Sequence, residues 1–197
     1  MRNAAIVASG GANIASLQFA LARLGCASTL TTDADDVADA THVILPGVGA
    51  APDAMARLAE AGLVDVIPRL RQPVLGICLG MQLLFEASDE GDTPCLGILP
   101  GRVRRLASSA ELPVPHMGWN RLTVRRDRPL IEGLGDGYAY FAHGYGTASG
   151  THTLASCAYG EEFAAVVEQG NFCGTQFHPE RSGPLGARLL ANFLARS

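Results

Sequence analysis

The stretch Pro73-Val74-Leu75-Gly76-Ile77-Cys78-Leu79-Gly80 sets a cysteine between two glycines, directly after a short apolar run. The run predicts a buried strand that ends at Ile77, and a helical pattern of apolar residues follows at Met81, Leu83, Leu84 and Phe85. A nucleophile on such a strand-to-helix turn has a strained backbone, and flanking glycines let the neighbouring chain approach closely. A buried cysteine before an ordinary glycine turn is the alternative, and this stretch alone leaves it open.

We expect the Cys78 thiol to be exposed at the carboxyl edge of the sheet. There the N-terminus of the following helix favours the thiolate over the thiol. The amide of Leu79 is expected to point at the oxyanion that forms on an attacked carbonyl. The stretch therefore predicts a cysteine nucleophile.

Short β-branched runs alternate with helical patterns through the first half of the chain, which is typical of βαβ units. The predicted strands cover residues 4–8, 28–31, 42–45 and 73–77, and the predicted helices cover 14–24 and 52 to about 61. A glycine turn is expected at Gly10-Gly11 and an acidic turn over 33–39. This half predicts an α/β fold with a mostly parallel sheet covered by helices on both faces.

Shorter segments with more glycine and proline follow residue 90. Their alternating patterns predict additional antiparallel or edge strands in the second half of the chain. These strands are expected over residues 102–106, 121–124, 138–142, 164–168 and 172–177. The chain closes on a predicted helix with one apolar face, made of Leu185, Leu189, Leu190 and Phe193.

Length and composition predict one soluble domain over residues 1–197, because the 197 residues are 48% hydrophobic and 17% charged and contain no repeat or long linker. No apolar stretch is long enough for a membrane helix, and no cleavage site follows the N-terminus. Five cysteines without regular spacing argue against a disulfide scaffold and for a reducing cytoplasm. Four of them are expected to pack as small hydrophobes: Cys26, Cys95, Cys157 and Cys173.

All 15 basic residues are arginines, and the formal net charge is -4. This mildly acidic balance argues against nonspecific nucleic-acid binding. Arginines nevertheless concentrate in the middle of the chain. We favour the interpretation that they form a solvated surface, and a docking face for a partner is the alternative. They are Arg102, Arg104, Arg105, Arg121, Arg125, Arg126 and Arg128.

A second motif, Gln176-Phe177-His178-Pro179-Glu180, ends an apolar strand with a histidine and a carboxylate two residues apart. Residues i and i+2 of an extended chain point to the same side, so Glu180 is placed to orient the His178 ring and stabilise its charged form. A lone histidine at a strand end is more often structural, but the carboxylate and the distant cysteine favour a Cys78, His178, Glu180 triad. The remaining histidines, His42, His116, His143 and His152, lack the spacing of a zinc site, so no metal is expected.

A third motif, Pro46-Gly47-Val48-Gly49, ends a strand expected beside the Cys78 strand. A glycine-rich turn presents backbone N–H groups with little hindrance and can adopt more than one peptide orientation, which suits an oxyanion hole. It is not a phosphate loop, because no Gly-Lys-Ser/Thr follows.

Together these motifs resemble those of the class I glutamine amidotransferases, whose triad is an elbow cysteine followed much later by His-Pro-Glu. Within that class the chain resembles the family of glutaminase subunits of imidazole glycerol phosphate synthase. The landmarks keep the family's order over nearly the whole chain. They are Leu45-Pro46-Gly47-Val48-Gly49-Ala50, Gly76 through Gln82, Pro115-His116-Met117-Gly118-Trp119-Asn120, Tyr140-Phe141-Ala142-His143 and Phe177-His178-Pro179-Glu180-Arg181-Ser182.

The resemblance implies a three-layer fold and a glutaminase without a cofactor. Cys78 would attack the side-chain amide of glutamine, His178 would protonate the departing ammonia, and a glutamyl thioester would then be hydrolysed. The implied oxyanion residues are Val48, Gly49 and Leu79, and the implied substrate-binding residues are Gly47, Gln82, Gly144 and Tyr145. The family usually carries serine or threonine where this chain has Gly144.

The resemblance also implies a partner, since ammonia must travel as the neutral molecule through an apolar route. In the family the partner is a (β/α)8-barrel cyclase subunit, with which the glutaminase forms a heterodimer. The cyclase uses the ammonia to make imidazole glycerol phosphate and an aminoimidazole carboxamide ribonucleotide (AICAR) in histidine biosynthesis. The implied interface residues are Asn13, Trp119, Asn120, Tyr140 and Arg181.

Two features depart from the family pattern. Arg181 stands where lysine is commoner, and the N-terminal strand leads into Ala8-Ser9-Gly10 where the family has Asp-Tyr-Gly. The motifs leave two other functions to compare with this one. One is a class I glutaminase of another pathway, such as anthranilate, folate-precursor or pyridoxal phosphate synthesis. The Pro-Gly-Val-Gly loop and the motif Pro115-His116-Met117-Gly118-Trp119-Asn120 argue against it. The other is a noncatalytic docking subunit, against which the intact triad argues.

Overall fold

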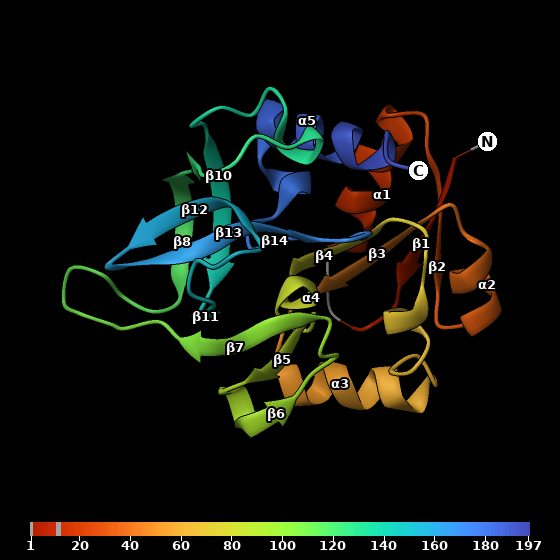
Figure 1. Cartoon of the computed structure of the whole chain (residues 1–197), viewed down its shortest axis with the longest axis horizontal. Helices are drawn as coiled ribbons and strands as arrows, with labels where there is room; N and C mark the ends of the chain where they lie inside the picture. Colours follow the sequence, from red (N-terminus) through yellow and green to blue (C-terminus); the bar gives the residue numbers. More distant parts are fainter. Residues whose placement is uncertain (1, 11–12) are drawn as a thin grey trace.

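A computed structural model describes residues 2–10 and 13–197 of the chain. Its central sheet has eight strands in the order β2-β1-β3-β4-β14-β13-β12-β9 (Figure 1). The strands are β1 (Asn3–Val7), β2 (Ala27–Thr31), β3 (His42–Gly47), β4 (Val74–Cys78), β9 (Thr123–Val124), β12 (Thr153–Tyr159), β13 (Glu161–Gln169) and β14 (Phe172–Thr175). Strands β2, β1, β3, β4 and β14 run parallel, and the remaining pairs are antiparallel.

Two smaller sheets follow. One pairs β8 (His116–Arg121) with β10 (Tyr138–His143), and the other orders β11 (Tyr145–Gly146), β7 (Leu99–Arg105), β5 (Phe85–Ser88) and β6 (Thr93–Pro94). Their strands pair antiparallel as predicted except for β5 and β7, which run parallel. The α-helices are α1 (Ile14–Arg23), α2 (Ala34–Asp39), α3 (Ala51–Glu60), α4 (Leu79–Gln82) and α5 (Gly183–Leu194). The 3₁₀ helices are η1 (Ile67–Arg69), η2 (Glu90–Asp92), η3 (Pro129–Ile131) and η4 (Pro179–Arg181).

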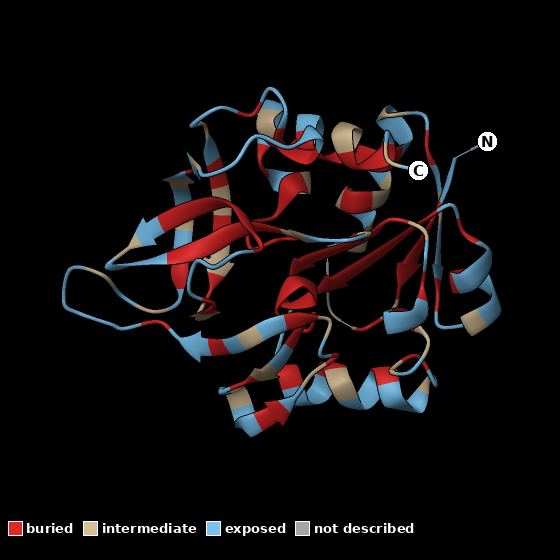
Figure 2. Cartoon of the chain, viewed as in Figure 1, coloured by how far each residue is buried: buried red, intermediate tan, exposed pale blue. Residues whose placement is uncertain are grey.

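Helices cover both faces of the parallel strands, with α1 and α5 on one side and α3 on the other (Figure 1). Alternate residues of one strand enter different apolar clusters: Ile6 of β1 packs in the cluster that contains Leu17 of α1, whereas Val7 packs in the cluster that contains Leu58 of α3. Strands buried on both faces are apolar throughout, which explains the continuous hydrophobic runs of the sequence and the buried strands of Figure 2. The predicted α/β fold is confirmed.

The strand that carries Cys78 pairs directly with the strand that ends in the glycine loop. The register of β3 and β4 sets Gly47 opposite Cys78. Because the two strands are parallel, both carboxyl ends reach the same edge of the sheet. The predicted neighbourhood of the two motifs is therefore confirmed.

Three expectations about local structure were wrong or incomplete. The helical pattern after Cys78 ends at Gln82, and Phe85 begins strand β5. These residues are buried in any case, so their apolar run does not distinguish helix from strand. The acidic stretch is the short helix α2 rather than a turn, because Asp33 caps it by accepting hydrogen bonds from the amides of Asp35 and Asp36. Strand β12 was not anticipated, and Leu122 interrupts the predicted strand 121–124.

The glycine turn expected at Gly10-Gly11 is described only in part. Gly10 has a positive φ of 103°. Gly11 lies outside the described residues.

Candidate active site

Cys78 is the last residue of β4 and immediately precedes α4, as the elbow prediction requires. Its backbone is strained, with φ 55° and ψ -111°. The glycines on either side are required by close packing. A Cβ added at Gly80 would lie 1.7 Å from the carbonyl oxygen of Leu45, and one added at Gly76 would lie 2.6 Å from the carbonyl oxygen of Gly80. Only glycine fits where α4 crosses β3 and β4 this closely.

The expectation of an exposed thiol was wrong, since Cys78 is only 5% exposed. Its sulfur lies 3.8 Å from the carbonyl oxygen of Ala142, and the side-chain amide of Gln176 donates to it at 3.7 Å. Strand β10 and the residue that follows β14 therefore cover the elbow, and Cys78 borders a cavity. Helix α4 is four residues long, so its dipole contributes little to stabilising a thiolate.

His178 supplies the positive charge that the helix lacks. Its Nδ1 lies 3.0 Å from Oε1 of Glu180, and the two side chains are only 11% and 5% exposed. Burial alone lowers the pKa of His178, but the Cys78 and Glu180 side chains more than offset it and raise the pKa to about 10. The ring therefore holds its proton at neutral pH, and the predicted orienting contact with Glu180 is present.

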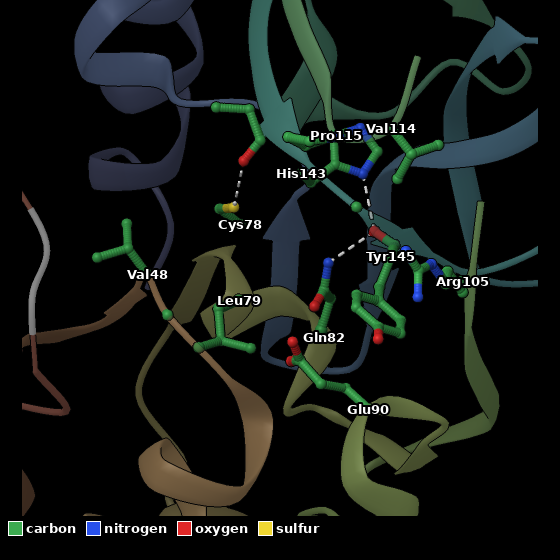
Figure 3. A pocket seen from close by; sticks show the side chains of 13 residues that line it. Val48, Cys78, Leu79, Gln82, Glu90, Arg105, Val114, Pro115, His143 and Tyr145 are labelled. Carbon is green, nitrogen blue, oxygen red and sulfur yellow. Dashed lines mark hydrogen bonds between the residues drawn. The ribbon is translucent and has the colours of Figure 1, made fainter. Parts of the chain in front are cut away.

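The glycine loop borders the cavity beside Cys78. Val48 and Gly49 line the same cavity as Cys78 and Leu79 (Figure 3). Gly49 has φ 97°, a conformation that favours glycine. The hydroxyl of Ser9 donates to the carbonyl oxygen of Pro46 at 2.5 Å, and this buried bond fixes the start of the loop. The departure at Ser9 therefore contributes a contact to the loop.

A cavity of about 340 Å³ opens beside Cys78 and contains most of the predicted site. Gly47 lies outside it and borders a second, smaller cavity. The predicted residues that line the larger cavity are Val48, Gly49, Cys78, Leu79, Gln82, Gly144 and Tyr145. The motifs did not predict the residues that complete the wall, which are Glu90, Arg105, Val114, Pro115 and His143 (Figure 3) together with Ala142.

Polar groups of the cavity wall are held in fixed orientations. The amide nitrogen of Gln82 donates to the carbonyl oxygen of Tyr145 at 2.8 Å and to Oε1 of Gln176 at 3.0 Å. Glu90 accepts a hydrogen bond from the backbone amide of Ala51, at the start of α3, at 2.8 Å. Arg105 lies opposite Tyr145 across the pairing of β7 and β11. The wall thus carries one carboxylate and one guanidinium.

The smaller cavity, of about 10 Å³, lies next to the triad and is the size of one water molecule. His178 and Glu180 line it together with Asn13, Gly47 and Pro46. The Oε2 atom of Glu180 is buried and has no hydrogen-bond partner among the described residues. The larger cavity therefore borders Cys78, and the smaller one borders His178 and Glu180.

Three of the five predicted interface residues form one surface cluster, in which Trp119 and Arg181 are exposed and Tyr140 is half-buried. Trp119 is 56% exposed, and its ring lies 6.1 Å from that of Tyr140 in an edge-on arrangement. The guanidinium of Arg181 lies 4.4 Å above the Tyr140 ring, so a planar cation stacks where the family pattern has an ammonium. Asn13 caps α1 beside the smaller cavity. Asn120 is different, because its amide nitrogen donates within the chain, to the carbonyl oxygen of Ala158.

The mid-chain arginines are partly neutralised at the surface. Arg102 pairs with Asp89 and Asp92. Arg121 pairs with Asp136 at 3.3 Å, and Arg125 pairs with Glu162. Exposed pairs of this kind contribute little to stability. They fit the solvated-surface interpretation, whereas Arg105 lines the cavity beside Cys78.

The other cysteines behave as small hydrophobes. All five are free thiols, and burial raises the pKa of Cys95 to about 11 and the pKa values of Cys157 and Cys173 to about 12. Across residues 2–10 and 13–197, no three histidine, cysteine or acidic side chains are grouped as metal ligands. No helix in that same part of the chain has the length and apolar character to span a membrane.

A family model described as glutamine amidotransferase class-I matches residues 5–197. The chain belongs to the class I glutamine amidotransferase family. Within it the chain groups with imidazole glycerol phosphate synthase subunit HisH: it is 54% identical to that subunit of Xylella fastidiosa (strain Temecula1) over 98% of both chains. It is 52% identical to the subunit of Xanthomonas campestris pv. campestris (strain 8004) over 100% of this chain and 99% of the relative. Both resemblances inferred from the motifs are confirmed.

The fold agrees with solved structures. The structure of PurLQS from Thermotoga maritima matches with a TM-score of 0.76 at 22% identity, over 98% of this chain and 97% of that one. At this identity the likeness concerns the fold alone. It supports the mixed α/β architecture with a mostly parallel central sheet.

Proposed function

We propose that this chain is the glutaminase subunit of an imidazole glycerol phosphate synthase, with Cys78, His178 and Glu180 as its catalytic triad. One observation carries the assignment of residues. A strained cysteine lines a cavity and lies within hydrogen-bonding reach of a buried histidine, and Nδ1 of that histidine lies 3.0 Å from a carboxylate oxygen. That geometry is what nucleophilic attack on an amide requires.

In the first step the Cys78 sulfur attacks the carboxamide carbon of glutamine. The proton held by His178 stabilises negative charge on the sulfur beforehand and then passes to the amide nitrogen, which leaves as ammonia. Glu180 engages Nδ1, so it keeps Nε2 directed to the thiol and stabilises the charged ring. The product of this step is a glutamyl thioester on Cys78.

In the second step water attacks the thioester carbon. His178, now neutral, accepts a proton from the water, and the thiolate of Cys78 leaves with glutamate as the released product. Both steps pass through a tetrahedral oxyanion. The backbone amides of Leu79 and of Val48 or Gly49 are the donors proposed for it, because the loop and the elbow border the same cavity.

The charges of the cavity wall suit the two ends of an α-amino acid. Glu90 offers a carboxylate to the substrate ammonium, and Arg105 offers a guanidinium to the substrate carboxylate. Gly144 and Tyr145 add backbone groups beside Arg105. Free glutamine carries both an α-ammonium and an α-carboxylate group, whereas a glutamine residue inside a peptide has neither.

Ammonia released at Cys78 is proposed to pass to a (β/α)8-barrel cyclase subunit in a heterodimer. The surface cluster of Trp119, Tyr140 and Arg181 supports this docking face, since tryptophan, tyrosine and arginine are enriched among the residues that contribute most to binding at protein interfaces. The cyclase would use the ammonia to form imidazole glycerol phosphate and AICAR in histidine biosynthesis. We further propose that residues 1–197 act as a single domain in the cytoplasm, without a cofactor.

Reconstitution tests this function. The chain is mixed with a candidate cyclase and its phosphoribulosyl-formimino nucleotide substrate, and glutamate and imidazole glycerol phosphate are assayed together. We expect the two products in equal amounts, and weak glutamine hydrolysis by the isolated chain that rises when the cyclase and its ligand bind. Glutamine left intact by the assembled complex would contradict the function. Full glutaminase activity without any partner would contradict our expectation that the Pro46-Gly47-Val48-Gly49 loop rests in a nonproductive peptide orientation until the cyclase binds.

A further inference from the structure

A continuous thread of hydrogen bonds connects strand β8, which carries Trp119, with the glutamine cavity. It begins at the side chain of Asn120, whose amide nitrogen lies 3.3 Å from Nε2 of His116. Nδ1 of His116 lies 3.2 Å from Nε2 of His143, and Nδ1 of His143 lies 2.7 Å from the carbonyl oxygen of Tyr145. The two histidines are directly opposite each other in the register of β8 and β10.

The thread continues on the other side of Tyr145. Its carbonyl oxygen also accepts the amide of Gln82, and that amide reaches Gln176. Gln176 in turn donates to the sulfur of Cys78 at 3.7 Å. Figure 3 shows the central part, in which His143 and Gln82 converge on the Tyr145 oxygen from opposite sides.

The thread allows one protonation pattern. The Tyr145 oxygen can only accept, so His143 carries its proton on Nδ1 and accepts at Nε2 from Nδ1 of His116. Asn120 then donates to Nε2 of His116. Both rings are uncharged at neutral pH, because burial lowers the pKa values of His116 and His143 to about 4. Every ring nitrogen of the pair has a partner.

This pattern determines how Gln82 faces the substrate. A carbonyl oxygen with two donors is fully engaged, and both hydrogens of the Gln82 amide are used, one on Tyr145 and one on Gln176. The amide therefore cannot flip without losing both hydrogen bonds, of which the one to Gln176 is fully buried. Its oxygen remains as an acceptor on the cavity wall, where Gln82 is a lining residue.

We propose that His116 and His143 are positioning residues of the glutaminase, which fix the Tyr145 carbonyl and through it the orientation of Gln82 in the glutamine pocket. The inference rests on the proposed function and adds two residues to its machinery. Neither histidine exchanges a proton with substrate in this role. His143 acts through Tyr145, and His116 acts through His143.

Aromatic packing is the competing explanation for the pair. The ring of His116 stacks on those of Tyr159 and Phe141, with 4.0 Å and 5.0 Å between ring centroids. The rings of His143 and Phe163 meet edge-on, with their centroids 4.9 Å apart. If packing alone required these rings, phenylalanine would replace them better than a polar side chain. If the hydrogen bonds matter, a side chain that keeps one donor and one acceptor would replace them better.

The experiment compares His143→Gln with His143→Phe in the complex with the cyclase. The side chain introduced by His143→Gln retains a donor for Tyr145 and an acceptor for His116. The side chain introduced by His143→Phe keeps an aromatic ring but loses both the donor and the acceptor. We expect His143→Phe to raise KM for glutamine about tenfold, the cost of one unpaired buried group, with kcat and the rate of Cys78 alkylation by iodoacetamide little changed. We expect His143→Gln to stay within about threefold of the parent KM. His116 lies outside the cavity wall and cannot contact the substrate from there. We expect His116→Phe to raise KM for glutamine as well.

Glutamine affinity is measured in parallel by calorimetry on the same variants in a Cys78→Ala background, where no turnover occurs. Thermal unfolding of each variant separates misfolding from weakened binding. The inference is overturned if His143→Phe binds glutamine as tightly as its parent, or if the Phe and Gln variants weaken binding equally. Failure of the proposed function would look different, because the unaltered chain would then leave glutamine intact in the complex.

Discussion

Nδ1 of His178 and Oε1 of Glu180 lie 3.0 Å apart in side chains that are almost removed from solvent. The contact engages one ring nitrogen and leaves Nε2 for the Cys78 thiol. It is also one of the two interactions that raise the pKa of His178 to about 10, against the opposing effect of burial. The protonation state of His178, and with it that of the proposed catalytic pair, therefore depends on this carboxylate.

The pH dependence of catalysis follows from that contact. The raised pKa means that the imidazolium persists at neutral pH and is lost as the pH rises through about 10. We predict that kcat/KM for glutamine falls on the alkaline side in that range, and that Glu180→Gln moves the fall to lower pH by about one to three units. Initial rates of glutamate formation across the alkaline range check this. An alkaline limb that Glu180→Gln does not move would contradict the assigned role.

The close approach at the elbow predicts a large loss of stability for Gly80→Ala. The added Cβ would lie 1.7 Å from the Leu45 carbonyl oxygen, so strands and helix must separate. We expect a loss of about 3 kcal/mol or more in the free energy of unfolding, measured by urea denaturation. Gly144→Ala is the matched control, because the nearest atom to its new Cβ is 3.4 Å away. Equal stability of the two variants would contradict the packing described for β3, β4 and α4.

Gly144 also allows a test of how the substrate carboxylate is bound. There is room for a side chain at this position, since the nearest atom is a methyl group of Val114. If backbone amides bind the carboxylate, Gly144→Ser leaves KM for glutamine within about twofold, because no hydrogen bond to substrate is added or lost. A KM that falls tenfold would instead indicate that a hydroxyl group is needed there and that this chain lacks it.

Ser9 is expected to stabilise the glycine loop. Its hydroxyl is buried and donates to the Pro46 carbonyl, so Ser9→Ala leaves that oxygen without this donor. We predict a loss of about 1 to 2 kcal/mol in the free energy of unfolding. Ser108→Ala, at an exposed position, should change it by less than about 0.5 kcal/mol. Chemical denaturation of both variants makes the comparison, and equal values would show that the Ser9 bond contributes nothing.

The strand-to-helix turn at Cys78 and the contact between His178 and Glu180 could be predicted because their signals are local in the sequence. The glycines beside Cys78 reflect a close approach that no other residue permits, and the spacing of His178 and Glu180 reflects their short contact. The parallel pairing of β3 with β4 follows from alternating strands and helices. These features need no knowledge of distant parts of the chain.

The environment of the thiol could not be predicted, because distant residues create it. Ala142 and Gln176 cover Cys78 from 64 and 98 positions away in the sequence. Glu90 and Arg105 reach the cavity from separate elements and belong to no motif. The helical pattern up to Phe85 misled for a similar reason: a fully buried run has no polar face that reveals its period.

Glutamine-dependent synthesis by a Cys78→Ala variant tests the central claim most directly. The variant is assembled with the cyclase, and imidazole glycerol phosphate is measured with glutamine or with an added ammonium salt as the nitrogen source. We predict that synthesis from glutamine is abolished and that synthesis from ammonium persists, because only the release of ammonia requires the Cys78 sulfur. Retained use of glutamine by the variant would contradict the account.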